Sequence, residues 1–411
     1  MRVKPFAALR PPREYVSEVA APPYDVIDSS EALELAGEKS LLHITKPEID
    51  FSPMLHDSDP EVYRRAICNF AKWQQAGYLV RDSRPCYYVY AQTMGERTQY
   101  GFVLCAHCQD YLDGHIKKHE LTRKEKEDDR MVHVDIQSAN IEPVFFAFRR
   151  QTELEDILRE VSLSESEYDF TDENGFGHKF WVISDQSLID KITELFGEKV
   201  ESFYIADGHH RSAAAARVGQ ERALRNPDHS GEEEYNWFMA VCFPDDQLKV
   251  MDYNRVVKDL NGLEPTQIIG MIGEHFDIMC KGEEICYPQE LHSFSMYLDG
   301  KWYSLRARPD IYHDGNLVEK LDVSLLSKYI LDDILGIKDL RKDPRIDFVG
   351  GIRGLEALKK RVDSGEMKIA FALYPVTMEQ IEDISDNNFI MPPKTTWFEP
   401  KLRSGLAIHT F

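Results

Sequence analysis

The most informative segment of the chain reads SFYIADGHHRSAAAARVGQERAL over residues 202–224. Residues 202–206 predict a short buried strand, Asp207-Gly208 predicts a turn, and the alanine-rich run that follows consists of strong helix formers. A strand, a glycine turn and a helix in direct succession present the amides of a helix N-terminus to an anion. The sequence therefore predicts an anion site at the start of this helix, with phosphate as the natural ligand.

Each polar residue of this turn has an expected role. Asp207 is expected to cap the helix, and Gly208 lets the backbone approach a ligand closely because it has no Cβ. Arg211 projects from the first helical turn, where the helix dipole already favours an anion. His209 and His210 point in different directions on a helix, so one is expected to face the substrate as acid, base or donor while the other packs. The alternative is a capped helix with histidines on the surface.

The composition is that of a folded protein with more than one domain. The chain has 411 residues, of which 43% are hydrophobic and 29% charged, so two domains with buried cores are expected. Its net charge of -22 would repel a nucleic acid or an anionic membrane, and neither is expected as a partner. The N-terminus has no apolar signal segment, no run is long enough to span a bilayer, and seven scattered cysteines suit a reducing compartment. These observations predict a cytoplasmic protein.

Periodic patterns predict both helices and strands along the chain. The predicted helices are 60–76, 186–196, 265–276 and 324–335, and the predicted strands are the hairpins 87–108 and 294–307 and the runs 179–184 and 237–244. The acidic segment 152–173 has weak periodicity and is expected at the surface. Together these elements predict an α+β fold of mixed sheets with flanking helices.

A composition shift near Asn261-Gly262-Leu263-Glu264-Pro265 predicts a domain boundary. Residues 1–260 are expected to form a catalytic α+β domain that contains the ADGHHR turn, and residues 261–390 a second α+β domain. Residues 391–411 are expected to form a C-terminal arm that returns to the active site. Prolines in this arm prevent a regular strand or helix.

Five segments resemble one known family. They are YIADGHHRSAAAARVG at 204–219, VAAPPYDVI at 19–27, HELTRKEKEDDR at 119–130, YNRVV at 253–257 and MPPKTTWFEPKLRSGL at 391–406. On these segments the chain resembles the DUF1015 family. More distantly, the turn is similar to the phosphate-binding turn of the ParB/sulfiredoxin-like superfamily, which includes free serine kinases. That resemblance implies a ParB/sulfiredoxin-like phosphate-binding core, nucleotide phosphates on the DGHHR turn, and a carboxylate base that acts on a serine hydroxyl.

Two carboxylates are candidates for this base. Asp25 follows a rigid Pro22-Pro23 pair, although it could equally cap a turn. Glu120 begins the charged run 119–130, in which Arg130 is the candidate phosphate-binding cation. The alternative for most of this run is a solvated helix face.

The C-terminal segment provides the candidate substrate-binding donors on a backbone stiffened by prolines. These residues are Lys394, Thr395, Thr396, Lys401 and Ser404. The alternative is an arm that packs Trp397 and Phe398 into the other domain, and both readings are compatible.

Two pairs with metal-like spacing are discounted. Cys105 and Cys108 lack a second pair of ligands, and strand alternation sends their thiols to opposite faces. His115 and His119 are four residues apart without the glutamate of a zinc-protease motif. No residue is therefore assigned as a metal ligand.

The expected function is phosphoryl transfer between a nucleotide, ATP or ADP, and serine or phosphoserine, with Mg²⁺ offsetting the nucleotide charge. A phosphoserine phosphatase needs the same groups. From a different class, a nucleotide- or metabolite-binding regulatory protein would keep the phosphate site without chemistry. The sequence has no P-loop and no kinase glycine-rich loop. The direction of the reaction is left open, and so is the choice between a monomer and a homodimer.

Overall fold

The computed structural model describes residues 1–411. Contacts within the chain divide it into two compact units, the first comprising residues 1–248 and 400–411 and the second residues 249–399. The junction after residue 248 precedes the domain boundary that was expected near residue 261. The junction after residue 399 falls within the expected C-terminal arm. Lys394, Thr395 and Thr396 therefore belong to the second unit, whereas Lys401 and Ser404 belong to the first.

The first unit is built on a nine-stranded sheet in the order β6-β11-β8-β12-β5-β4-β10-β9, with β1 paired to β5. The strands are β1 (Val3–Lys4), β4 (Tyr87–Met94), β5 (Arg97–His107), β6 (Ile116–Lys117), β8 (Val144–Phe148), β9 (Tyr168–Thr171), β10 (Gly177–Ile183), β11 (Phe203–Asp207) and β12 (Trp237–Pro244). Pairs β8–β12 and β6–β11 are parallel and the other pairs are antiparallel, so the sheet is mixed. Two short ribbons accompany it, β2 (Leu9–Arg10) with β3 (Val80–Arg81) and β7 (Ala139–Asn140) with β21 (His409–Thr410).

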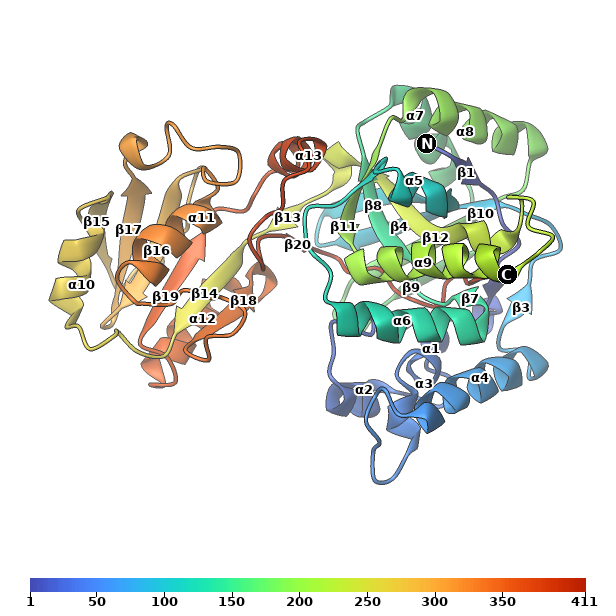
Figure 1. The fold of residues 1–411 in the computed structure, drawn as a ribbon, viewed down its shortest axis with the longest axis horizontal. Coiled ribbons are helices and arrows are strands. Elements are labelled where there is room, and N and C mark those ends of the chain that lie inside the picture. The colour runs from blue at the N-terminus through green and yellow to red at the C-terminus, as the bar shows by residue number, and fades with distance from the viewer. The chain divides into compact units, whose positions relative to one another are not determined.

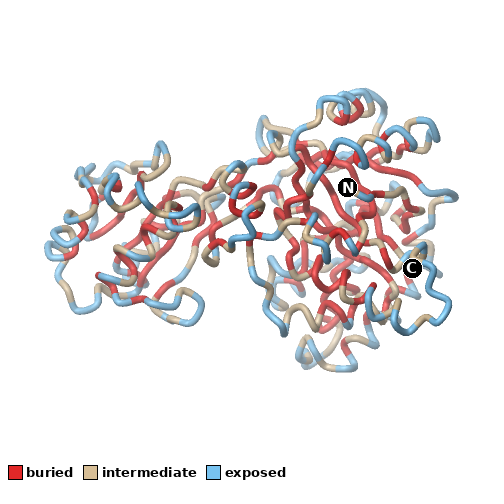
Figure 2. Tube along the Cα trace, turned by 45° about the horizontal axis from the view of Figure 1, so that its top comes forward, coloured by how far each residue is buried: buried red, intermediate tan, exposed pale blue.

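Nine α-helices belong to this unit. They are α1 (Val16–Val19), α2 (Ser29–Leu35), α3 (Leu42–Thr45), α4 (Pro60–Gln75), α5 (Cys108–Leu112), α6 (Lys124–Gln137), α7 (Thr152–Ser162), α8 (Gln186–Lys199) and α9 (His209–Arg225). Helices α6 and α9 lie side by side (Figure 1). Figure 2 shows the strands of the sheet mostly buried, with exposed positions on loops and outer helix faces.

The alanine run of α9 is explained by burial on two sides. Ala215 and Ala216 join the apolar core of the large sheet, whereas Ala214 and Val218 pack against Met131 of α6. Small side chains let one helix approach both a sheet and a second helix closely. The start of α9 is thereby fixed among elements that come from distant parts of the sequence.

The second unit contains a six-stranded sheet in the order β15-β17-β16-β19-β14-β18, and all its pairs are antiparallel. Its strands are β14 (Tyr253–Val257), β15 (Phe276–Gly282), β16 (Ser293–Leu298), β17 (Lys301–Ala307), β18 (Ile346–Gly350) and β19 (Ile369–Leu373), and β13 (Val250–Met251) pairs with β20 (Trp397–Phe398). Its helices are α10 (Pro265–Ile272), α11 (Asp322–Leu326), which continues as a π-helical turn over Ser327–Asp332, α12 (Gly354–Asp363) and α13 (Met378–Asp386). Strand β18 lies at an edge of the sheet.

The α+β class with mixed strands and flanking helices is confirmed, although the mixed sheet is that of the first unit. Both predicted hairpins are present, as β4–β5 and β16–β17. The weak periodicity assigned to residues 152–173 is wrong, because α7 buries Leu154, Ile157 and Leu158 on one face. No helix combines the length and the apolar character that a membrane crossing requires.

Candidate functional site

The turn between β11 and α9 leaves the start of the helix open. Gly208 is the N-cap residue, with a φ of 91° that favours glycine, and no side chain caps the helix. The expectation that Asp207 caps α9 is therefore wrong. Its carboxylate instead accepts a hydrogen bond from Arg211 at 3.1 Å, and the Lys401 ammonium lies 3.8 Å from its other oxygen. The first-turn amides of α9 thus remain available to an anion.

Arg211 lies at the centre of the predicted site and is only 7% exposed. Its Nη1 donates to the Pro143 carbonyl at 2.5 Å, and its Nη2 lies 3.1 Å from Asp207 and 3.7 Å from Asp25. Its Nε has no hydrogen-bond partner. Although burial opposes the charge, these carboxylates raise the pKa of Arg211, so the guanidinium stays charged.

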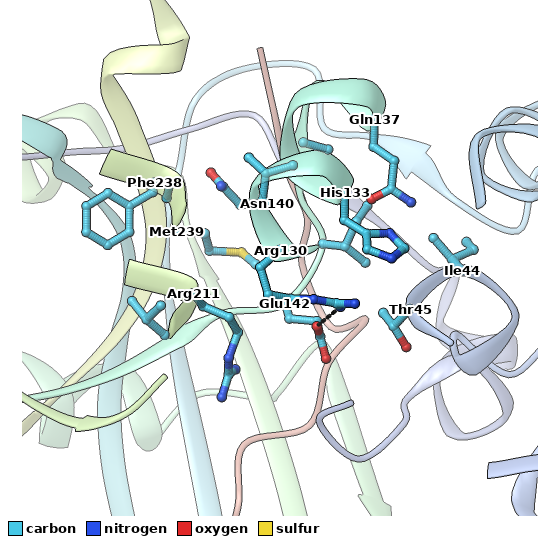
Figure 3. Close-up of a pocket in the computed structure, with 15 residues that line it drawn as sticks. Ile44, Thr45, Arg130, His133, Gln137, Asn140, Glu142, Arg211, Phe238 and Met239 are labelled. Atoms are coloured by element: carbon cyan, nitrogen blue, oxygen red, sulfur yellow. Dashed lines mark ion pairs between the residues drawn. The ribbon is translucent and has the colours of Figure 1, made fainter. Parts of the chain in front are cut away.

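A buried carboxylate, Glu142, lies behind this arginine. Glu142 accepts hydrogen bonds from the Tyr24 amide at 2.9 Å and the Ser404 hydroxyl at 3.4 Å. Arg130 lies 3.8 Å from its second oxygen, and the two side chains point toward one another (Figure 3). Burial raises the pKa of Glu142, and the nearby Arg211 and Arg130 partly offset that rise.

These side chains line part of a small cavity of about 40 Å³, and much of the rest of its wall is apolar. Its polar lining residues are Thr45, Arg130, His133, Gln137, Asn140, Glu142 and Arg211. Within it, His133 Nδ1, Gln137 Nε2 and Arg211 Nε have no hydrogen-bond partner. Because a buried water needs roughly 10–15 Å³ of such space, the cavity has room for about three waters. A nucleotide does not fit inside it, so any nucleotide would have to lie outside, on the open side of Arg211.

The two histidines of the turn differ in their surroundings. His209 is buried and packs edge-to-face on His119, with 4.7 Å between ring centroids. His210 is half-buried, and its Nε2 accepts a hydrogen bond from the Arg123 amide at 3.0 Å. Burial lowers the pKa of both rings, so both are neutral at pH 7.

The structure brings together predicted residues that are far apart in the sequence. Asp25, Asp207 and Lys401 surround Arg211 and the turn at Gly208. Arg130 and Ser404 reach the same cluster through Glu142. Lys401 and Ser404, which were predicted to bind the substrate, thus lie close to the turn.

The other candidates lie elsewhere or have contacts of their own. Glu120 is half-buried and precedes α6. In the second unit the Lys394 carbonyl accepts from Arg255 at 2.8 Å, and the Thr395 hydroxyl donates to the Pro392 carbonyl at 2.6 Å. Thr396 belongs to the same segment. The roles assigned to Glu120, Lys394, Thr395 and Thr396 stay predictions.

Three residues of the site were not predicted. Glu142, Tyr24 and His133 are all buried around Arg130, whose guanidinium lies 3.8 Å from the centroid of the Tyr24 ring. Glu142 could have been found from the sequence, because it stands immediately before the fully apolar strand PVFFAF. A carboxylate next to a buried strand requires a partner, which makes it a candidate functional residue.

No group of three or more His, Cys, Asp or Glu side chains is arranged to hold a metal ion. Asp25 and Asp207 both flank Arg211. Mg²⁺ is commonly held by one or two carboxylates together with the phosphates of the substrate. The donor set of the site therefore suits Mg²⁺ only as part of a complex with a phosphate ligand.

A family model described as "Protein of unknown function (DUF1015)" matches residues 3–324. No curated protein matches the chain. A solved structure described as a conserved hypothetical protein from Pyrococcus furiosus is 15% identical, with coverage of 74% of this chain and 94% of that one and a TM-score of 0.35.

Two further solved structures are similar to the chain at low identity. A free serine kinase mutant in complex with AMP is 15% identical, with coverage of 74% and 92% and a TM-score of 0.38. SbnI from Staphylococcus aureus, truncated at its C-terminus, is 9% identical, with coverage of 75% and 87% and a TM-score of 0.37. TM-scores this low do not support an inference about function. The function has to be inferred from the side chains of this chain.

Proposed function

The chain belongs to the DUF1015 family, and from this premise and the geometry around Arg211 we propose that it is a phosphotransferase acting on small molecules. One observation carries the proposal. A carboxylate that could act as a base, Asp25, and an uncapped helix N-terminus that could hold a phosphate meet at the same guanidinium. A phosphate group and a proton acceptor are the two parts that phosphoryl transfer needs side by side.

The phosphate would be held by the first-turn amides of α9, with the charges of Arg211 and Lys401 nearby. Because Asp207 engages both cations, they are already oriented before the phosphate arrives. Preorganised donors stabilise developing charge more effectively than mobile ones. Gly208 contributes by its missing side chain, since a Cβ there would lie 3.3 Å from the Arg211 guanidinium.

Asp25 is the proposed base, because 31% of its side chain is exposed and a substrate hydroxyl can reach it. The hydroxyl oxygen attacks the γ-phosphorus of ATP, and the new O–P bond forms as the bond to the departing ADP breaks. The hydroxyl proton passes to Asp25. Mg²⁺, held through the phosphates with Asp207 as the nearby carboxylate, would offset the charge of the nucleotide.

The finer proposal is that the acceptor is serine and the nucleotide ATP, or phosphoserine and ADP in the reverse direction. It is supported by the resemblance of the DGHHR turn to that of free serine kinases. A hydroxy amino acid is also small enough to lie next to the 40 Å³ cavity while the nucleotide stays outside. The unpartnered donors of that cavity, through ordered water, would favour the carboxylate end of such a substrate.

The test combines nucleotide titration calorimetry with phosphorus NMR of turnover, using ATP and serine. Asp25→Asn is expected to lower kcat by about 10²- to 10⁴-fold while nucleotide binding is retained. Asp28→Asn is the matched control, because Asp28 only caps α2 and asparagine caps a helix equally well. Unchanged turnover in Asp25→Asn would refute the role of the base.

The phosphate site is tested with Arg211→Lys, which keeps the charge but loses the planar fork that reaches both Pro143 and Asp207. Nucleotide affinity is expected to fall at least tenfold while circular dichroism stays unchanged. Tight nucleotide binding without any turnover in the parent chain would instead favour a regulatory binding protein.

A further inference from the structure

The second unit contains a large cavity lined entirely by its own residues. Its volume is about 500 Å³, which lies within the range of roughly 300–1,000 Å³ typical of small-molecule sites. It lies along α12 and the edge strand β18, and α12 is next to β14 and β18 in the fold (Figure 1). Two segments singled out in the sequence, YNRVV and MPPKTTWFEPKLRSGL, contribute Tyr253 and Trp397 to its wall.

Three aromatic rings form one side of this cavity. Tyr253 contacts Trp397 edge-on with 4.9 Å between ring centroids, and it contacts Phe348 in the same manner at 5.9 Å. A Cβ added at Gly350 would lie 3.1 Å from the Trp397 indole, so the indole rests on the backbone of β18. Rings held by packing offer a preformed surface to a flat ligand group at a low cost in conformational entropy.

The hydroxyl group of Tyr253 accompanies the rings. Tyr253 is only 8% exposed, and its hydroxyl group has no hydrogen-bond partner in the protein although the residue lines the cavity. A polar group in such a position is ordinarily satisfied by water or by a ligand. The cavity therefore offers a hydrogen-bonding group next to its aromatic wall.

Two cations without an ion-pair partner also line the cavity. Arg353 and Lys360 line it, are exposed and form no ion pair. The carboxylates of the lining, Asp347 and Glu366, are both paired with Arg361, with a distance of 2.7 Å to Asp347. Two positive charges are thus left without a counterion, and no side chain caps the N-terminus of α12 beside Arg353.

A third cation lies behind the aromatic wall. Arg255 is 1% exposed and its guanidinium lies 5.5 Å from the Phe348 ring. It donates to the backbone carbonyls of Tyr253 and Lys394 and has no carboxylate partner. Burial lowers the pKa of Arg255 to about 9, so it is still charged at pH 7. A buried charge without a counterion favours an anion in its vicinity.

From the aromatic wall, the unpaired cations and the volume we infer that this unit has a binding site of its own for a small anion that carries a flat ring, chemistry that a nucleoside monophosphate has. The ring lies against Trp397 and the phosphate is held by Arg353 and Lys360. An extended peptide along β18 is disfavoured, because the Asp347 side chain already accepts from the Phe348 amide at 2.8 Å. The site is separate from the proposed phosphotransferase site of the first unit.

Calorimetric titration of the full chain with AMP, followed in parallel by tryptophan fluorescence, tests this inference. Arg353→Ala combined with Lys360→Ala is expected to weaken AMP binding at least tenfold. Lys359→Ala is the matched control, because Lys359 is on the same helix but pairs with Asp363 and does not line the cavity. Trp397→Phe is expected to remove the fluorescence response and to weaken binding less. Adenosine and inorganic phosphate are each expected to bind more weakly than AMP.

Several outcomes would overturn the inference. They are no binding of AMP at millimolar concentration, equal affinity in the double variant and the parent chain, and equal affinity for adenosine and AMP. If AMP binding is lost in Arg211→Lys but kept in the double variant, the nucleotide binds only in the first unit. That result would reject the second site and support the proposed function.

Discussion

The charged side chains of the two cavities differ in how far they are buried and in how they are paired. In the first unit, Arg130, Glu142 and Arg211 are buried around a cavity of about 40 Å³, and each lies within 4 Å of an opposite charge. In the second unit, Arg353 and Lys360 are exposed on a cavity of about 500 Å³ and depend on no partner. Buried charges couple function to stability, because removing one leaves the others uncompensated. Exposed charges can change affinity with little effect on the fold.

The largest expected difference between the units is in the response to losing a carboxylate. Glu142→Ala leaves the Tyr24 amide and the Ser404 hydroxyl without their buried acceptor, although Arg130 keeps Asp129 as an ion-pair partner, and it is expected to lower the free energy of unfolding by about 1–3 kcal/mol. Glu366→Ala removes an exposed partner of Arg361 and is expected to cost about 0–1 kcal/mol. Urea denaturation, with hydrogen exchange to assign the loss to α6 and α9, measures both values. An equal decrease in the free energy of unfolding in the two variants would show that the buried and the exposed carboxylate do not differ in their contribution to stability.

The second difference is in the response to acid. Burial lowers the pKa of His133 to about 3, whereas in the unfolded chain a histidine titrates near pH 6.5. Below about pH 6.5 the unfolded state therefore binds a proton that the folded state does not bind. The free energy of unfolding then decreases as the pH falls. His133 alone is expected to contribute up to about 1.4 kcal/mol per pH unit.

Denaturation curves between about pH 7 and pH 5 test this dependence. The ring centroids of His133 and Tyr63 are 5.0 Å apart, and His133→Phe keeps a ring in this place. Because phenylalanine cannot bind the proton, the unfolding free energy of this variant should depend less steeply on pH. His313→Phe is the control in the second unit, since 79% of the His313 side chain is exposed. An unchanged slope in His133→Phe would show that the buried histidine is not the source.

The smallest expected difference is in the response to salt. Raising NaCl from about 0.05 M to about 0.5 M shortens the screening length, so the affinity of the second unit for AMP is expected to fall about three- to tenfold. The unfolding free energy of the first unit should change little, because the ion pairs around its cavity are buried and its exposed ion pairs each contribute little. Calorimetry and denaturation at both salt concentrations check this pair of outcomes. AMP binding that is independent of salt would argue against the exposed cations.

The hairpins and the strand–turn–helix around Gly208 could be predicted because their causes are local. The alternation of aromatic and β-branched residues specifies β4 and β5, and Gly208 with the alanine run specifies the start of α9. The helix α7 was missed, since acidic residues on its exposed face obscured the apolar spacing of Leu154 and Leu158. The predicted capping role of Asp207 was wrong, because a side chain next to a helix can either cap it or pair with a nearby cation, and Asp207 pairs with Arg211.

By itself, the sequence determined that a glycine turn and a helix with an arginine in its first turn follow a buried strand, because neighbouring residues along the chain specify all of these features. Only the tertiary structure decided which groups meet there. Asp25, Glu142 and Lys401 come from three distant segments, and they meet around the turn because β8 lies between β11 and β12 and the C-terminal strand returns to β7. Such contacts depend on packing across the whole unit, which no short-range pattern specifies.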